Sequence, residues 1–150
     1  LKADTANKEA DTSKKESEAD LNYTNKVVAT YRVFEIQQNI KESEAREEFF
    51  RNNAGYMKVN TDFIKIQKDI LDGSKNQKIA YDKEYWKKQK ENLALLQKQL
   101  KLQIELAKKD NDWYAVRALT DIMNKTVQTV STVQDIQMKP LEYVKSFIPK

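Results

Sequence analysis

The sequence predicts an all-α protein built from long, coiled-coil-like helices that form one elongated region over residues 1–150. The chain contains only two glycines and two prolines, whereas average usage gives roughly 18 of these residues in a chain of this length. So few turn-forming residues cannot supply the many tight turns of an all-β or α/β domain. Apolar residues also recur at spacings of three and four, the pattern of helices that pack against other helices.

The first predicted helix covers residues 3–53. It opens with ADTANKE followed by ADTSKKE, a seven-residue phrase that is repeated with small residues at the heptad positions. The same register continues through Val27, Tyr31 and Phe34. We therefore expect one apolar stripe that is thin at its N-terminal end, where the helix is either frayed or shaped for close packing against several neighbours.

The second predicted helix covers residues 56–72 and has the clearest apolar stripe in the chain. Gly73 suits the left-handed position just past a helix end, and Ser74 followed by Gln77 resembles a capping box that opens the next helix. Gly55 marks either the end of the first helix or a kink in a longer one. These short connections are compatible with antiparallel hairpins or with a bent rod.

The third predicted helix covers residues 75–139, and residues 140–150 form a short tail. Its two apolar stripes are out of phase, and the change follows KKDND at 108–112, a poor helix-forming segment. Either the helix breaks there, with Asp110 or Asp112 as a new cap, or it continues with a stutter. We favour the continuous helix with a stutter.

The apolar stripes also raise the question of association. A monomeric three-helix bundle is one interpretation, but helices of such unequal length cannot cover one another. We therefore favour a homo-oligomer, an α-helical barrel or bundle in which each stripe packs against other copies. The predicted seam residues are Tyr56, Val59, Phe63, Ile66, Ile70, Leu93, Leu96, Leu100, Val116, Leu119, Met123, Val130 and Val133.

The absence of cysteine and histidine narrows the chemistry. It rules out a disulfide framework and a thiol-rich zinc site, and it removes the commonest general base. The acidic residues are scattered on helical faces, where salt pairing is their ordinary role. We therefore expect a non-enzymatic protein without a catalytic site, metal or cofactor. No run of about 18 apolar residues is present, so no membrane-spanning helix is expected.

The positive charge of the chain is concentrated in one segment. Residues 75–109 hold ten lysines against four acidic residues, a net charge of +6, although the whole chain carries +4. Lysine is a point charge without a base-reading fork, so a nucleic-acid contact would be non-specific and salt-sensitive. The alternative is an ordinary solvated helix surface. The candidate DNA-facing residues are Lys87, Lys88, Lys98, Lys101, Gln97 and Asn124.

The phrases ADTANKEADTSKKESEAD (3–20) and QKQLKLQIELAKKDNDWYAVRALTDIMNK (97–125) resemble the DNA pilot proteins, or minor spike proteins, of small icosahedral single-stranded DNA bacteriophages. The resemblance implies a structural virion protein of many parallel copies. These form a tube that conducts the genome across the host envelope. The implied partners are copies of the same chain, single-stranded DNA, other capsid proteins and the host envelope. The implied location is the virion, then the envelope on ejection.

A second hypothesis assigns the chain to another class. The amphipathic helices and the tail would then coat an intracellular membrane or granule surface, as in phasin-like or phage-shock-like scaffold proteins, with a cytoplasmic location.

Overall fold

The computed structural model describes residues 30–138, and all regular structure in that range is α-helical, which confirms the predicted all-α class. Residues 30–45 are helical, and α2 continues that rod after a turn at Arg46. The repeat at the start of the chain and the tail at 140–150 lie outside the described residues. The helices after residue 45 are α2 (Glu47–Phe50), α3 (Ala54–Lys75), α4 (Gln77–Ala80), α5 (Lys83–Lys109) and α6 (Trp113–Met138).

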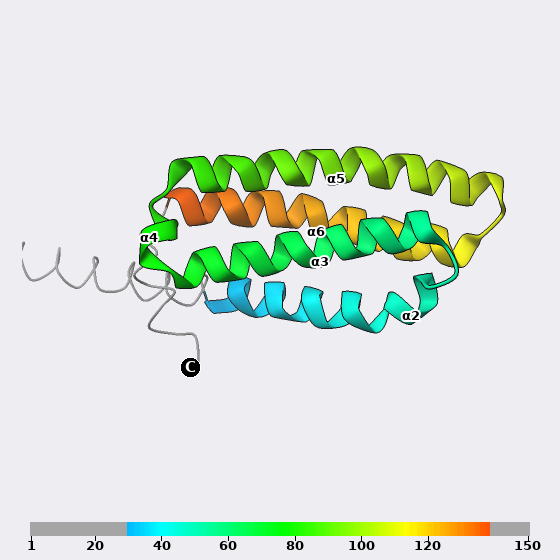
Figure 1. The fold of residues 1–150 in the computed structure, drawn as a ribbon, viewed down its shortest axis with the longest axis horizontal. Helices are drawn as coiled ribbons and strands as arrows, with labels where there is room; N and C mark the ends of the chain where they lie inside the picture. Colours follow the sequence, from blue (N-terminus) through cyan, green and yellow to red (C-terminus); the bar gives the residue numbers. More distant parts are fainter. Residues whose placement is uncertain (1–29, 139–150) are drawn as a thin grey trace, which may run out of the picture.

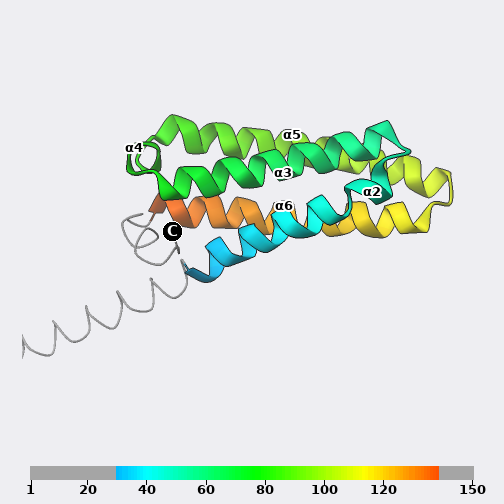
Figure 2. The same cartoon turned by 60° about the horizontal axis from the view of Figure 1, so that its bottom comes forward.

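The fold is an up-and-down bundle in which residues 30–50, α3, α5 and α6 lie side by side (Figures 1 and 2). Helix α5 packs against both α3 and α6, and α3 also contacts α6. The rod formed by residues 30–50 packs on α3 and is tied to α6 by ion pairs. It therefore lies diagonally opposite α5. This arrangement leaves α5 with two different flanks, one towards α3 and one towards α6.

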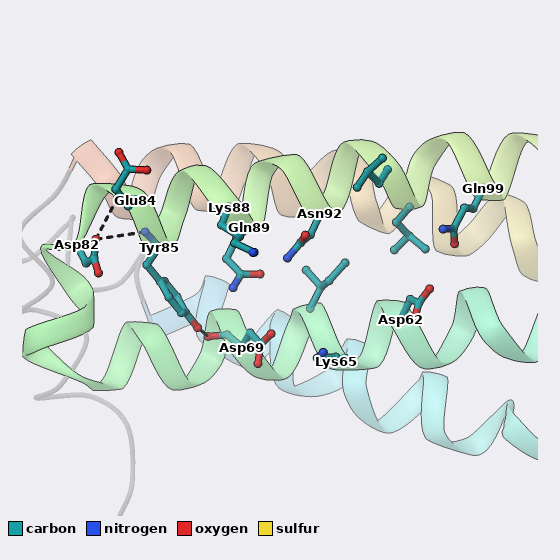
Figure 3. Close-up of a pocket in the computed structure, with 13 residues that line it drawn as sticks. Asp62, Lys65, Asp69, Asp82, Glu84, Tyr85, Lys88, Gln89, Asn92 and Gln99 are labelled. Atoms are coloured by element: carbon teal, nitrogen blue, oxygen red, sulfur yellow. Dashed lines mark hydrogen bonds between the residues drawn. The ribbon is translucent and has the colours of Figure 1, made fainter.

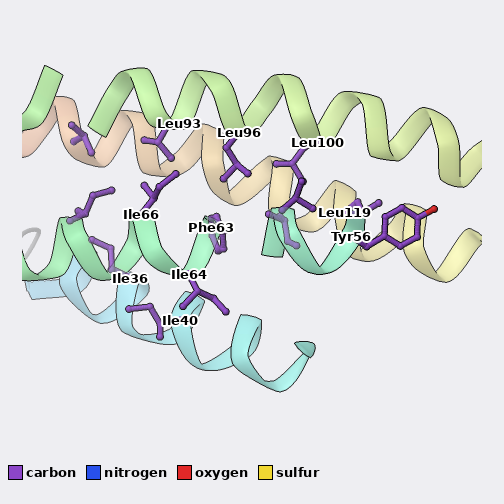
Figure 4. Close-up of a cluster of buried hydrophobic side chains, with 14 of the residues drawn as sticks. Ile36, Ile40, Tyr56, Phe63, Ile64, Ile66, Leu93, Leu96, Leu100 and Leu119 are labelled. Carbon is purple, nitrogen blue, oxygen red and sulfur yellow. The ribbon is translucent and has the colours of Figure 1, made fainter. Parts of the chain in front are cut away.

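The predicted seam residues line the core of a single chain (Figure 4). Ten of the thirteen are buried, and the other three, Val116, Met123 and Val130, are partly buried against the same cluster. Trp86, at the start of the α5 stripe, is also buried. These side chains thus stabilise one copy from within, and packing between copies remains a prediction.

The predicted continuous helix over 75–139 is wrong, because the chain reverses between α5 and α6. Asn111 adopts a positive φ of 55°. The amide of Asp112 donates to the carbonyl of Ala107 at 2.9 Å, and the amide of Asn111 donates to Lys108 at 3.1 Å. This is the Schellman pattern of a helix end, with asparagine in the left-handed position. The Asp112 carboxylate then caps α6 by accepting from the amide of Ala115 at 3.1 Å.

This reversal also removes the argument from unequal helix lengths. Helices α3, α5 and α6 contain 22, 27 and 26 residues, so they cover one another along most of their length. The predicted first helix over 3–53 is interrupted at Arg46 and ends before Asn53, whose side chain caps α3 by accepting from Tyr56. A further helix, α4, separates α3 from α5.

Both glycines lie inside α3, so neither acts as the predicted helix stop. Gly73 is needed for close packing instead, since a Cβ there would lie 2.6 Å from Cε1 of Tyr85. The predicted capping box is absent, because Ser74 donates to the carbonyl of Leu71 and Asn76 caps α4. The next cap is Asp82, whose carboxylate accepts from the first amides of α5.

Two buried amides on α3 fix its neighbours. Gln67 donates to the hydroxyl of Thr129 on α6 at 2.8 Å, and Asn60 donates to the carbonyl of Ser43 at 2.8 Å. Both amides are fully buried. Buried polar groups of this kind specify helix register because they are costly to leave unpaired.

Candidate nucleic-acid interface

The flank of α5 towards α6 carries a row of lysines. Gln97 identifies this flank, because its amide donates to the hydroxyl of Thr126 on α6 at 3.4 Å. Residues that differ from Gln97 by 4, 7, 11 or 14 positions share its side of the helix. Four lysines do so, and we call them the lysine row: Lys83, Lys90, Lys101 and Lys108.

The lysine row is available to a ligand. Lys83, Lys101 and Lys108 are exposed, and Lys90 is half-buried. Among the described residues, only Lys108 of the row forms a salt bridge, a 3.8 Å contact with Glu105 within the same helix. Exposed pairs of this kind contribute little. The row therefore presents its charge to solvent.

Helix α6 presents a second row, on its outer face. Seven exposed residues recur at alternating spacings of four and three, so they form one continuous face. This face contains one charge, which is positive, and one large aromatic ring. We call it the α6 row; its members are Trp113, Arg117, Thr120, Asn124, Val127, Ser131 and Gln134.

The two acidic residues of α6 are engaged in ion pairs. Asp121 pairs with Arg46 on the first rod and with Lys125. Asp135 pairs with Arg32 at 2.7 Å. Burial alone would raise the pKa of Asp121, but the hydrogen bond from Arg46 and the charge of Lys125 outweigh it and hold the pKa below its ordinary value of 3.8. Both carboxylates of α6 therefore form ion pairs with the first rod.

The predicted DNA-facing residues divide between the two flanks of α5. Lys101 belongs to the lysine row, and Gln97 lies at its edge in contact with α6. Lys87 and Lys98 are exposed further round α5. Asn124 belongs to the α6 row. Lys88 lies on the opposite flank, in the groove against α3.

Several residues of this surface escaped the sequence-based prediction. Lys83, Lys90 and Lys108 lie at helical spacings from Gln97. These spacings are visible in the sequence, but only the fold shows which flank they mark. Trp113 was treated as part of a continuous helix, yet its side chain is 57% exposed beside the helix reversal. Tyr114 next to it is 75% exposed. Trp86, which the sequence places among lysines, is only 1% exposed.

The described residues show no arrangement suited to a metal or a membrane span. No three acidic side chains in residues 30–138 come together as a possible metal site. None of the helices there has both the length and the hydrophobicity to cross a bilayer.

Comparison of the chain with protein-family models, curated proteins and solved structures finds no match.

Proposed function

We propose that this protein is a non-enzymatic structural protein of a phage virion that contacts single-stranded DNA through the lysine row and the α6 row. The observation that carries the proposal is that neighbouring antiparallel helices, α5 and α6, each expose one of these rows. Lysines neutralise phosphates, and an exposed tryptophan offers a surface on which bases stack. Uncharged amides and hydroxyls between them supply hydrogen bonds without anchoring the strand at one position.

The same surface explains why the contact is expected to be independent of base sequence. The rows hold four lysines and a single arginine, Arg117. Lysine binds phosphate as a point charge and does not read base edges. A strand that is held this way can move along the surface, which suits the genome passage that the pilot-protein resemblance implies.

Assembly with copies of the same chain is part of the proposal. The outer face of α5 exposes three leucines at spacings of seven and four: Leu95, Leu102 and Leu106. Their side chains are 57%, 66% and 49% exposed, and a heptad-like apolar stripe is the usual contact between helices. We propose this leucine stripe as the contact through which bundles associate into a larger conduit.

The DNA contact is tested by the anisotropy of a labelled oligothymidylate titrated with the full chain over a range of salt concentrations. The double variant Lys90→Gln/Lys101→Gln removes two charges from the lysine row. We expect the slope of log K against log salt to become shallower by about 1.4, at about 0.7 per lysine on a single strand. The matched control is Lys41→Gln/Lys58→Gln, which removes two exposed charges elsewhere.

Equal weakening by the two double variants would contradict the proposal, because the attraction would then follow net charge alone. Flotation with anionic vesicles distinguishes the scaffold hypothesis. Binding to vesicles with no binding to oligothymidylate would favour a membrane-coating protein over a DNA-contacting one.

A further inference from the structure

The other flank of α5 forms a groove with α3 (Figure 3). The groove has a volume of about 600 Å³. Its apolar lining comes from Ile66, Leu95 and Leu96. Its polar lining is mostly acidic or amide: Asp62, Lys65, Asp69, Asp82, Glu84, Tyr85, Lys88, Gln89, Asn92 and Gln99.

Two oxygen atoms in this groove lack the hydrogen bonds that buried acceptors require. The Oε1 atoms of Gln89 and Gln99 are buried, and neither has a partner. Gln89 as a whole is only 4% exposed, and Figure 3 shows its amide reaching from α5 towards α3. A buried acceptor without a donor costs about 1–3 kcal/mol. A hydrogen-bond donor from a bound ligand would satisfy these two acceptors.

The Gln89 side chain is held in place by its neighbour. Its amide interacts with the hydroxyl of Tyr85, and that hydroxyl donates to the backbone carbonyl of Asp69 at 2.5 Å. Tyr85 thus bridges the two helices at one end of the groove. The Gln89 acceptor is positioned by this contact before any ligand arrives.

The charge of the groove favours a cationic ligand. Its lining holds four carboxylates and two lysines, although Asp62 is paired with Lys58 at 3.1 Å and Asp82 caps α5. Asp69 forms no salt bridge with any residue between 30 and 138 that the structure describes. Burial raises its pKa, and the charge of Lys65 opposes that rise only in part. Asp69 is thus a partly desolvated carboxylate without a close ion-pair partner.

The spacing of the acceptors favours an extended ligand. Gln89 and Gln99 are ten residues apart on α5, which corresponds to roughly 15 Å along the helix. Asp62 and Asp69 are seven residues apart on α3, or about 10 Å. The apolar side chains between these positions can cover methylene groups.

We propose that the groove between α3 and α5 binds a linear aliphatic polyamine. The ammonium groups donate to the Gln89 and Gln99 oxygens and pair with the groove carboxylates, while the methylene segments lie on Ile66 and Leu96. This site is separate from the lysine row and does not depend on DNA binding.

The test is calorimetric titration of spermidine into the full chain. Asp69→Asn keeps the shape of the side chain and removes its charge, and we expect it to weaken binding about tenfold. Glu105→Gln removes an exposed carboxylate outside the groove and is expected to leave affinity unchanged. Lys88→Gln removes a like charge from the groove and is expected to tighten binding.

A second measurement locates the site without relying on these variants. The side-chain amide resonance of Gln89 is expected to shift in NMR spectra on addition of spermidine and to stay unchanged with propylamine. The proposal is overturned if spermidine does not bind saturably, if Asp69→Asn and Glu105→Gln weaken binding equally, or if the shifted resonances cluster outside the groove.

Discussion

The two flanks of α5 differ in charge although they belong to one helix. Towards α6, the helix carries the lysine row. Towards α3, the groove is lined by four carboxylates and by amide oxygens. Along the sequence, residues 75–109 read as one basic segment with a net charge of +6. The fold separates this segment into one surface suited to anions and another suited to cations.

The difference between the two flanks depends on α5 being packed in the bundle. A substitution in the core is expected to disturb that packing most. Leu100 is fully buried, so we expect Leu100→Ala to lower the free energy of unfolding by about 2–5 kcal/mol. Leu102 is 66% exposed on the same helix, so Leu102→Ala is expected to change it by under about 0.5 kcal/mol in a monomer. Urea denaturation at low protein concentration measures both.

The Leu102→Ala variant also tests the proposed association of bundles, at high protein concentration. Leu102 belongs to the leucine stripe that we propose as the contact between bundles. Light scattering of the Leu102→Ala variant is then expected to show a lower average mass than the wild-type chain. An unchanged mass, or a monomeric wild-type chain, would contradict that contact.

On the α3 flank, helices α3 and α5 approach each other closely at Gly73. A Cβ there would lie 2.6 Å from Tyr85 Cε1 and 3.0 Å from Trp86 Cη2, so we expect Gly73→Ala to destabilise by about 1–3 kcal/mol. Gly55→Ala is the matched control, because its Cβ would meet the end of the flexible Gln103 side chain at 2.9 Å. Alanine also has the higher helix propensity, so this variant is expected to be neutral or stabilising in thermal unfolding.

The proposed contact between the α6 row and DNA is tested by substituting Trp113. Stacking of a base on an aromatic ring is worth about 1–3 kcal/mol, so Trp113→Ala is expected to weaken oligothymidylate binding by about tenfold. Phe34→Ala is the control, since Phe34 is similarly exposed on the first rod. Similar losses in both variants would contradict a specific role for the α6 row.

The smallest expected effect is the pH-dependent stability contributed by the ion pairs of Asp121 on α6. The pKa of Asp121 is lower in the folded chain than its ordinary value. The ionised carboxylate therefore stabilises the bundle at every pH above that ordinary pKa. This stability is lost as the pH falls through the depressed folded pKa. Its size is below about 1 kcal/mol, because the side chain is 42% exposed and solvent screens the pairs.

Urea denaturation between neutral pH and pH 3 measures this contribution against the Asp121→Asn variant. The wild-type chain is expected to be more stable at neutral pH, with a difference that shrinks under acid conditions. Asp72→Asn, an exposed change on α3, is expected to show no such trend. A difference that grows under acid conditions would contradict the assigned pairing.

The sequence revealed the helices and their apolar faces because both follow local periodicity. Phe63, Leu93 and Leu119 were assigned to helix contacts from spacing alone, and all three are fully buried. The partner of each face was not predictable. One asparagine in a left-handed conformation, Asn111, turns a proposed long rod into a hairpin. Asparagine permits that conformation without requiring it, so the sequence left both outcomes open.

The candidate site was only partly predictable for a related reason. The excess of lysines on α5 is visible in the sequence, but the flank that each lysine occupies depends on where α3 and α6 pack. Lys88 and Lys90 are two residues apart and lie on opposite flanks. The buried amides of Asn60 and Gln67 were equally hidden, because an amide in a helix is usually solvent-facing.

The most direct test of the account is lysine footprinting by acetylation and mass spectrometry, with and without oligothymidylate. If the α5–α6 face binds DNA, Lys83, Lys90, Lys101 and Lys108 become protected, while Lys65 and Lys88 in the groove react as before. Uniform protection of all lysines, or protection confined to the groove, would contradict the division of α5 into an anion-binding and a cation-binding flank.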